Sequence, residues 1–315
     1  MKITILDTNT VTIGDIDMSV FDKFGDVTYY DAMEHEKVLG VIKDSDAVIC
    51  NKAKMTKEVM EKCPNLKYVG LFATGYNNVD LDYASERGIT VCNAPGYSTD
   101  SVVQHVFALL FQLANSTNKY TDSVENGDWV LSPMFTYFPY PIIELAGKTM
   151  GIIGFGTIGK KVAKVAESFG MKVIVHTRTV PENSEYTFVS KEELFKNSDV
   201  VSLNCPLNKG TEKIVNKDTL SLMKKTAILI NTSRGGTIDE DALKYALDNK
   251  LIFGAGLDVL TEEPMRTDCV LKNTENCIIT PHTAWASREA RERLVKLVSD
   301  NLEAFLKGNP VNKVN

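Results

Sequence analysis

The sequence lacks the patterns that mark several large classes of protein. None of its six cysteines forms a Cys-x-x-Cys pair and its four histidines do not cluster with them, which argues against a structural zinc site. No run approaches the roughly 18 apolar residues of a transmembrane helix, and no charged segment followed by an apolar one opens the chain. We therefore expect no metal, no membrane contact and a cytoplasmic protein with reduced thiols.

The charge balance argues against a protein that binds nucleic acid. Lys and Arg number 35 and Asp and Glu 41, so the net charge is −6, and there is no basic tract. Such a chain is a poor candidate for binding nucleic acid. The composition, 43% hydrophobic and 24% charged, is that of a globular protein, and at about 100–200 residues per domain the length of 315 residues predicts two domains.

Short apolar runs alternate with helical patterns in the first hundred residues, which favours a parallel α/β sheet. The predicted strands are Lys2–Asp7, Val27–Tyr30, Ala47–Asn51, Leu66–Phe72 and Ile89–Asn93, and the predicted helices are Thr56–Cys63 and Asp80–Arg87.

A long apolar helix and an aromatic segment interrupt this alternation. Residues Asp100–Lys119 predict one helix with a broad apolar band. Residues Gly127–Pro141 are irregular and rich in aromatics, as interfaces often are, although a loop lying over its own core is at least as common. We regard both segments as candidates for the contact of a homodimer.

The alternation then resumes and predicts six strands in series, which describe a doubly wound nucleotide-binding sheet. These strands are Thr149–Gly154, Lys172–His176, Asp199–Leu203, Ala227–Asn231, Phe253–Asp258 and Cys277–Thr280. A capping box of Ser190 with Glu193 begins one helix, residues Glu240–Asp248 form another, and an amphipathic helix from Ser287 to Leu306 ends the pattern.

A glycine motif follows the first strand of the second series. Residues 154–159, Gly-Phe-Gly-Thr-Ile-Gly, match G-x-G-x-x-G and precede an amphipathic helix, which is the context that dinucleotide binding requires. The glycines allow a tight turn, a close approach of the backbone to a pyrophosphate and close packing of helix on strand. The N–H groups at the start of the helix favour the phosphates.

The end of the next strand bears on the choice of cofactor. An acidic residue about 20 positions after the motif would bind the ribose 2′-hydroxyl of NAD. Here Thr177 and Arg178 occupy that place, and a guanidinium matches the geometry of a 2′-phosphate. The cofactor is therefore NAD or NADP, and the arginine favours NADP, although an arginine at this point could also be a solvated charge or a platform for adenine.

Four segments together resemble the D-isomer-specific 2-hydroxyacid dehydrogenases over essentially the whole chain. They are residues 73–80 (Ala-Thr-Gly-Tyr-Asn-Asn-Val-Asp), the glycine motif, residues 231–236 (Asn-Thr-Ser-Arg-Gly-Gly), and residues 257–259 (Leu-Asp-Val) leading to Glu262-Glu263-Pro264 and Pro281-His282-Thr283-Ala284-Trp285. The resemblance implies catalytic roles for Arg234, Glu263 and His282.

Physical reasoning agrees with these roles. Reduction of a 2-oxo acid needs a hydride at C2 and a proton on the carbonyl oxygen, for which histidine is a natural general acid. Glu263 bonded to His282 would favour the imidazolium and orient it, and Arg234 would clamp the substrate carboxylate and carbonyl. Taken singly, each of the three has a structural or solvated alternative.

The remaining site residues are assigned by position and by resemblance. The cofactor-binding residues are Gly154, Phe155, Gly156, Thr157, Ile158, Gly159, Thr177, Arg178, Cys205, Pro206, Thr211, Thr232, Ser233 and Asp258, the last resembling the family residue near the nicotinamide carboxamide. The substrate-binding residues are Asn51, Lys52, Thr74, Gly75 and Trp285, where Trp285 could instead serve a core or an interface.

The expected fold is α/β with two doubly wound parallel-sheet domains and a cleft between them. As the resemblance implies, residues 1–98 and 288–315 are expected to form a flavodoxin-like substrate domain, and residues 99–287 a Rossmann-type NAD(P)-binding domain. The motifs look most like those of glycerate dehydrogenases, also called hydroxypyruvate reductases, so the expected reaction interconverts hydroxypyruvate, or glyoxylate, and the D-2-hydroxy acid. The alternatives are a D-lactate or other D-2-hydroxyacid dehydrogenase and a dinucleotide-sensing regulatory protein.

Overall fold

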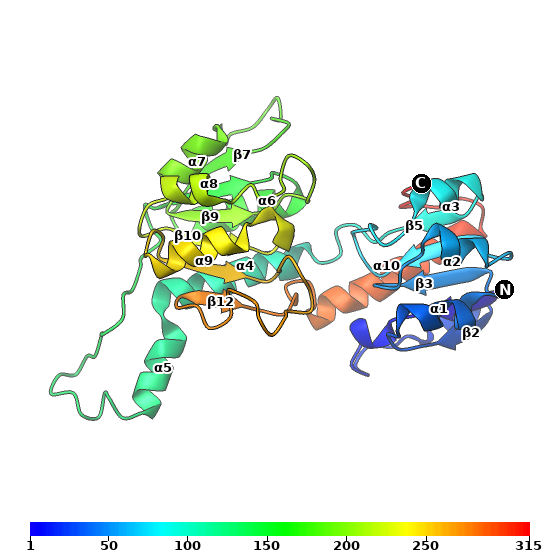
Figure 1. Ribbon diagram of the computed structural model, residues 1–315, viewed down its shortest axis with the longest axis horizontal. Coiled ribbons are helices and arrows are strands. Elements are labelled where there is room, and N and C mark those ends of the chain that lie inside the picture. Colours follow the sequence, from blue (N-terminus) through cyan, green and yellow to red (C-terminus); the bar gives the residue numbers. More distant parts are fainter. The chain divides into compact units, whose positions relative to one another are not determined.

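A computed structural model describes residues 1–315 and divides the chain into two units, each of which contains one parallel sheet (Figure 1). The first unit is Met1–Ser98 with Trp285–Asn315, and the second is Thr99–Ala284. The chain returns to the first unit at residues 284–285 rather than at the expected 287–288. The reason is that Trp285 packs edge-on against Tyr97, with ring centroids 6.1 Å apart, in a core of the first unit.

The first unit has five parallel strands in the order β2-β1-β3-β4-β5, which is the order of the flavodoxin-like class expected for this domain. The strands are β1 (Lys2–Ile5), β2 (Asp26–Tyr29), β3 (Ala47–Cys50), β4 (Tyr68–Leu71) and β5 (Thr90–Cys92). The helices are α1 (His35–Ile42), α2 (Lys57–Glu61), α3 (Leu81–Glu86) and α10 (Arg288–Leu306), with 3-10 turns at Thr8–Thr10 and Ser19–Phe24.

Both faces of the central strands are buried, which explains why β3 and β4 are apolar runs, whereas the edge strand β2 alternates exposed and partly buried residues. In β3, Val48 and Cys50 pack with the side chains of α1, α2 and α3, whereas Ala47 and Ile49 pack with those of α10 and the second 3-10 turn. The carboxylate of Asp80 accepts from the Tyr83 N–H and begins α3.

The second unit has seven parallel strands in the order β12-β11-β10-β9-β6-β7-β8. The strands are β6 (Thr149–Ile153), β7 (Lys172–His176), β8 (Thr187–Phe188), β9 (Val200–Leu203), β10 (Ile228–Asn231), β11 (Gly254–Leu257) and β12 (Cys277–Ile279). The helices are α4 (Thr99–Asn115), α5 (Thr117–Glu125), α6 (Thr157–Ser168), α7 (Lys191–Asn197), α8 (Lys217–Leu222) and α9 (Glu240–Asp248), with a 3-10 turn at Gly235–Thr237. The six predicted strands are all present, and the two-residue edge strand β8 is added to them.

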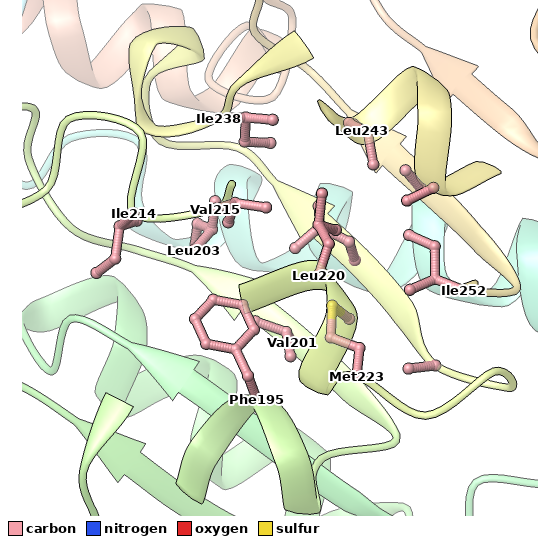
Figure 2. Close-up of a cluster of buried hydrophobic side chains, with 14 of the residues drawn as sticks. Phe195, Val201, Leu203, Ile214, Val215, Leu220, Met223, Ile238, Leu243 and Ile252 are labelled. Carbon is pink, nitrogen blue, oxygen red and sulfur yellow. The ribbon is translucent and has the colours of Figure 1, made fainter. Parts of the chain in front are cut away.

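Two apolar cores cover the faces of the second sheet. One joins α4 and α6 to side chains such as Ile152 and Ile230. The other joins α7, α8 and α9 to the opposite side chains of the same strands, and Figure 2 shows Phe195, Val201 and Leu220 meeting within it. Because helices cover both faces, polar side chains that could meet a ligand lie at the ends of the strands.

The predicted helix Asp100–Lys119 is wrong in its extent. It ends at Asn115, because Ser116 adopts a left-handed conformation with φ 51° and its hydroxyl donates to the Pro141 carbonyl. The separate helix α5 follows, and Figure 1 shows α5 and the chain after it extending away from the sheet of their unit. Neither α4 nor any other helix is long and apolar enough to cross a membrane.

Candidate active site

The predicted site residues of the second unit gather at the carboxyl ends of its strands. The glycine motif follows β6, Cys205 follows β9, Arg234 follows β10, Asp258 follows β11 and His282 follows β12. The order of strands reverses between β6 and β9, because the chain first proceeds through β7 and β8 and then returns to the other side of β6. Such a switch point is where open α/β sheets bind ligands.

The glycine motif has the geometry that a dinucleotide requires. Gly154 has φ 91°, and a Cβ there would lie 2.8 Å from the Asn204 carbonyl carbon, while a Cβ on Gly159 would lie 2.2 Å from the Gly154 oxygen. A Cβ on Gly156 would meet no protein atom within 4 Å. Gly154 and Gly159 therefore serve packing, whereas Gly156 keeps open the space at the start of α6.

Neighbouring groups also fit a dinucleotide. Thr157, the first residue of α6, is exposed beside Gly156, so the N–H groups of the first turn face open space. The buried Oδ1 of Asn204, which follows β9 at the switch point, has no hydrogen-bond partner. Phe155 is 9% exposed and its ring packs edge-on against Tyr186 and Phe188, so its backbone rather than its side chain is left for a ligand.

The end of β7 carries a positive charge and no acidic side chain. Thr177 is partly buried and Arg178 is exposed, and no carboxylate lies within ion-pair distance of the Arg178 guanidinium. The guanidinium is therefore available to an anion.

The loop after β9 is organised by Thr211. Its hydroxyl donates to the Pro206 carbonyl at 2.6 Å and accepts from the Asn208 N–H at 2.9 Å. The Cys205 thiol lies in the core, and burial raises its pKa to about 11. This thiol is therefore protonated and unreactive at neutral pH.

Asn231, which belongs to the segment 231–236 but was given no role from the sequence, shapes the loop that carries Arg234. It is fully buried at the end of β10, its Oδ1 accepts from the N–H and hydroxyl of Ser233, and its Nδ2 donates to the Arg234 carbonyl at 3.0 Å. Thr232, between them, is partly exposed. An asparagine ending a buried strand could have indicated this turn, because its amide bonds backbone groups locally.

Arg234 is exposed, and the residue after it joins its loop to the loop that carries Glu263. A Cβ on Gly235 would lie 1.8 Å from the Leu260 carbonyl carbon, so only glycine permits this contact. Strands β10 and β11 run in register, with Asn231 opposite Leu257, which places the two loops side by side. The Arg234 Nη1 donates to the Ser233 carbonyl at 2.7 Å.

Glu263 and His282 form a pair, as predicted from the sequence. The Nδ1 of His282 lies 2.7 Å from the Glu263 Oε2, and the other oxygen, Oε1, accepts from the Leu260 N–H at 3.0 Å. An ionised carboxylate only accepts, so the imidazole carries a proton on Nδ1 and directs Nε2 away from the glutamate. About a third of each side chain is exposed, so Nε2 can be reached by a substrate.

Glu240 is a second residue that the sequence did not reveal. Its Oε1 accepts from the Thr261 N–H at 2.6 Å and so connects the start of α9 to the Glu263 loop. Nothing in its sequence context distinguishes Glu240 from an ordinary acidic residue in the first turn of a helix.

Asp258 is 1% exposed and holds three consecutive N–H groups of the histidine loop. Its carbonyl accepts from His282, its Oδ1 from Thr283 at 2.8 Å, and its Oδ2 from Ala284 at 2.8 Å. The Thr280 hydroxyl also donates to Oδ1, at 2.6 Å. The contacts of this carboxylate are thus with the protein, and a contact with the nicotinamide carboxamide stays a prediction.

The predicted substrate residues of the first unit lie in two loops at the carboxyl ends of its strands. A single oxygen of the buried Asp7, Oδ2, accepts from the N–H groups of Asn51, Lys52 and Ala53 at 2.7–2.9 Å. These bonds leave the Lys52 side chain exposed. Asp7 lies two residues beyond the end of β1, in a left-handed conformation with φ 63°, whereas the sequence pattern predicted it within that strand.

The second of these loops contains Thr74 and Gly75. The Thr74 hydroxyl donates to the Ala94 carbonyl and its own carbonyl accepts from the Asn93 amide, which fixes the turn. The backbone N–H groups of Thr74 and Gly75 donate to no protein acceptor. Trp285, the remaining predicted substrate residue, packs against Tyr97 in a core of the same unit.

Comparison with known proteins agrees with the sequence resemblance. Residues 107–284 match the family model described as "D-isomer specific 2-hydroxyacid dehydrogenase, NAD binding domain". Hydroxypyruvate reductase of Blautia hydrogenotrophica is 44% identical over 321 aligned positions, covering 100% of both chains. Glycerate dehydrogenase of Methylorubrum extorquens is 41% identical over 281 positions, covering 89% of this chain and 88% of its own.

A solved structure extends the comparison to the fold. The NADPH-dependent glyoxylate/hydroxypyruvate reductase of Sinorhizobium meliloti, in complex with NADP and malonate, superposes with a TM-score of 0.85 at 31% identity and covers 99% of this chain and 96% of its own. Its likeness covers both units. The chain belongs to the D-isomer-specific 2-hydroxyacid dehydrogenase family and binds a nicotinamide dinucleotide.

Proposed function

We propose that this protein reduces hydroxypyruvate to D-glycerate, or glyoxylate to glycolate, with NAD(P)H. The observation that carries the proposal is the bond between His282 and Glu263 at the ligand-binding edge of the dinucleotide sheet. Relatives that cover nearly the whole chain are named for these substrates, which supports the choice among 2-oxo acids.

The proposed proton transfer follows from which ring nitrogens of His282 carry a proton. Glu263 holds Nδ1 protonated, so a proton on Nε2 makes the ring an imidazolium whose charge the carboxylate offsets. His282 then donates the Nε2 proton to the carbonyl oxygen as that oxygen gains negative charge. The bound nicotinamide would supply the hydride.

Arg234 is the proposed clamp for the substrate. Its guanidinium is exposed at the edge where His282 lies, and two parallel N–H groups match a carboxylate or the oxygens of a 2-oxo acid. As charge develops on the carbonyl oxygen, the same cation stabilises it.

The proposed substrate contacts of the first unit are donors. The N–H groups of Thr74 and Gly75 offer hydrogen bonds to a carboxylate, and the exposed Lys52 offers an ammonium. The Asn51 amide is 6% exposed and already donates to the Thr10 hydroxyl at 2.8 Å, so it would contact a substrate only through its second N–H. For Trp285, the packing against Tyr97 supports a structural role, and its indole would act on the substrate only indirectly.

For the choice of cofactor we propose NADPH. Arg178 has no acidic partner and follows β7, where an acid would be needed to bind a ribose 2′-hydroxyl. The residues proposed to hold the pyrophosphate are Gly156, Thr157 and Ile158, whose backbone N–H groups begin α6. Thr232 and Ser233 would lie along the nicotinamide half.

We also propose a homodimer formed by the second unit. The segment Gly127–Pro141 exposes several large apolar side chains, including Val130 at 85%, Leu131 at 84% and Phe135 at 89%. Such an apolar surface on one extended segment is more than a monomer usually leaves in water. The apolar face of α4, by contrast, is buried on its own sheet.

One panel of assays tests the enzymatic proposal. Hydroxypyruvate, glyoxylate and pyruvate are each incubated with NADH and NADPH, the loss of reduced nicotinamide is followed by absorbance, and the product is resolved on a chiral column. We expect turnover of hydroxypyruvate and glyoxylate, with D-glycerate as the product of hydroxypyruvate. A protein that binds the cofactor tightly but turns over no 2-oxo acid would instead be a dinucleotide sensor.

A further inference from the structure

The helix α4 contacts the histidine loop through a residue that no role described above requires. His105 lies in the middle of α4, with 21% of its side chain exposed. Its Nε2 is 2.9 Å from the Thr280 hydroxyl and 3.4 Å from the Asp258 Oδ1. Asp258 accepts hydrogen bonds from the loop that carries His282, and Thr280, two residues before His282, donates to Asp258.

The hydrogen bonds around Thr280 determine which atom of His105 is protonated. A threonine hydroxyl has one hydrogen, and at 2.6 Å it is donated to Asp258 Oδ1. The oxygen of Thr280 must then accept in its contact with His105, so the histidine carries a proton on Nε2. The N–H of the ring thus points at both the hydroxyl and the buried carboxylate.

The loop that this chain of bonds supports is conformationally demanding. His282 has φ 55°, a left-handed conformation that is uncommon for residues other than glycine and is retained where surrounding bonds impose it. The bonds that impose it come from Asp258, whose carbonyl and two carboxylate oxygens accept from the N–H groups of residues 282–284.

Asp258 itself needs support, because a carboxylate that is 1% exposed must be paired or hydrogen-bonded. Oδ2 receives the Ala284 N–H, whereas Oδ1 receives Thr280 and Thr283 and faces His105. The His105 imidazole is therefore the side chain of α4 that faces the Asp258 carboxylate.

We propose that His105 is a positioning residue for the reaction: through Thr280 and Asp258 it holds the loop on which His282 presents its Nε2 to the substrate. The proposal rests on the proposed function for its catalytic consequence, but its structural part, the immobilisation of residues 282–284, stands apart from any substrate.

Three variants of the full chain test the proposal. His105→Ala removes the donor, His105→Gln keeps a nitrogen donor near the position of Nε2, and Thr280→Val breaks the same connection from the other end without changing the size of the side chain. His35→Ala, on the exposed helix α1 of the first unit, is the matched control. Each variant is first checked for an unchanged thermal unfolding curve.

The first measurement is hydrogen–deuterium exchange of the amides of residues 282–284, which needs neither cofactor nor substrate. Loss of one hydrogen bond of ordinary strength should speed their exchange by about tenfold in His105→Ala and in Thr280→Val. His105→Gln should restore protection, and His35→Ala should not change it. Unchanged exchange in both deletion variants, or no restoration by glutamine, overturns the proposal.

The second measurement is steady-state reduction of hydroxypyruvate. A displaced proton donor should lower kcat by about tenfold in His105→Ala, leave KM for NAD(P)H unchanged and be rescued by His105→Gln. A fall in activity that glutamine does not rescue contradicts a positioning role. If the wild-type protein reduces no 2-oxo acid, the proposed function fails, whereas the exchange rates still decide whether His105 holds the loop.

Discussion

The bond between Glu263 and His282 leads to a prediction whose size follows from the structure. In Glu263→Gln the shape of the side chain is kept and the negative charge is lost. A hydrogen bond to a charged group contributes about 1.5–3 kcal/mol. About a third of both side chains is exposed, and solvent screening therefore places the effect near the lower end of that range.

A loss of about 1.5 kcal/mol corresponds to a fall in kcat of roughly tenfold, because each 1.4 kcal/mol of barrier is a factor of ten. The assay is steady-state reduction of hydroxypyruvate at saturating cofactor. The neighbouring Glu262→Gln is the matched control. The Glu262 side chain is 65% exposed, and its Oε2 lies 3.6 Å from the Arg266 Nη1. We expect this control to retain wild-type activity.

A double-mutant cycle makes the prediction specific. If Glu263 acts through His282, then Glu263→Gln should have little further effect once His282 is replaced by alanine. Equal activity of Glu263→Gln and Glu262→Gln would refute the reasoning, as would full additivity of the two substitutions.

Further outcomes are expected at the same site and around it. His282→Ala should lower kcat by about 10²–10⁴-fold and leave the Kd for NAD(P)H, measured by fluorescence titration, unchanged; weakened cofactor binding would mean that the side chain has another role. Arg178→Ala should raise the Kd for NADPH and spare that for NADH, and equal effects on both would exclude a contact with the 2′-phosphate. Gly156→Ala should leave urea unfolding unchanged, because its Cβ would meet no protein atom, but should weaken cofactor binding, because that Cβ would fill the space proposed for the pyrophosphate. Gly235→Ala should lower the free energy of unfolding by about 1–3 kcal/mol, because its Cβ would lie 1.8 Å from a backbone carbon. The double substitution of Phe135 and Phe138 by serine should give a monomer in multi-angle light scattering, and an unchanged mass would contradict the proposed dimer contact.

Hydrophobic patterning predicted every strand except β8, because the central strands are buried apolar runs and the others are bounded by glycine or polar turns. It failed where an element is short or where a single residue breaks the pattern. The two-residue strand β8 is too short to show a period, and the helix α8 (Lys217–Leu222) has one turn and a half. The break at Ser116 was missed because serine is compatible with a helix, and its left-handed conformation depends on a bond to the distant Pro141 carbonyl.

The candidate site shows the same division. The glycine motif was recognisable because dinucleotide binding requires its glycines in that context. The trio Arg234, Glu263 and His282 was assigned through the resemblance of four segments to a known family, and the chemistry of the three side chains agreed with it. Glu240 and His105, which support them, were not recognisable, since they act through contacts with segments elsewhere in the chain. Asn231 bonds its own turn, so its signal was local and was overlooked.

The sequence by itself determined the class of fold, the ends of the strands at which a ligand is expected and the residues able to carry a proton or an anion, because these depend on local periodicity and on the chemistry of side chains. Only the tertiary structure decided that Glu263 bonds Nδ1 of His282, that Asp258 is occupied in holding the loop of that histidine, and that Trp285 packs in the first unit. These outcomes depend on which loops meet at the ends of neighbouring strands, and the pairing of parallel strands brings together residues that the chain itself keeps far apart.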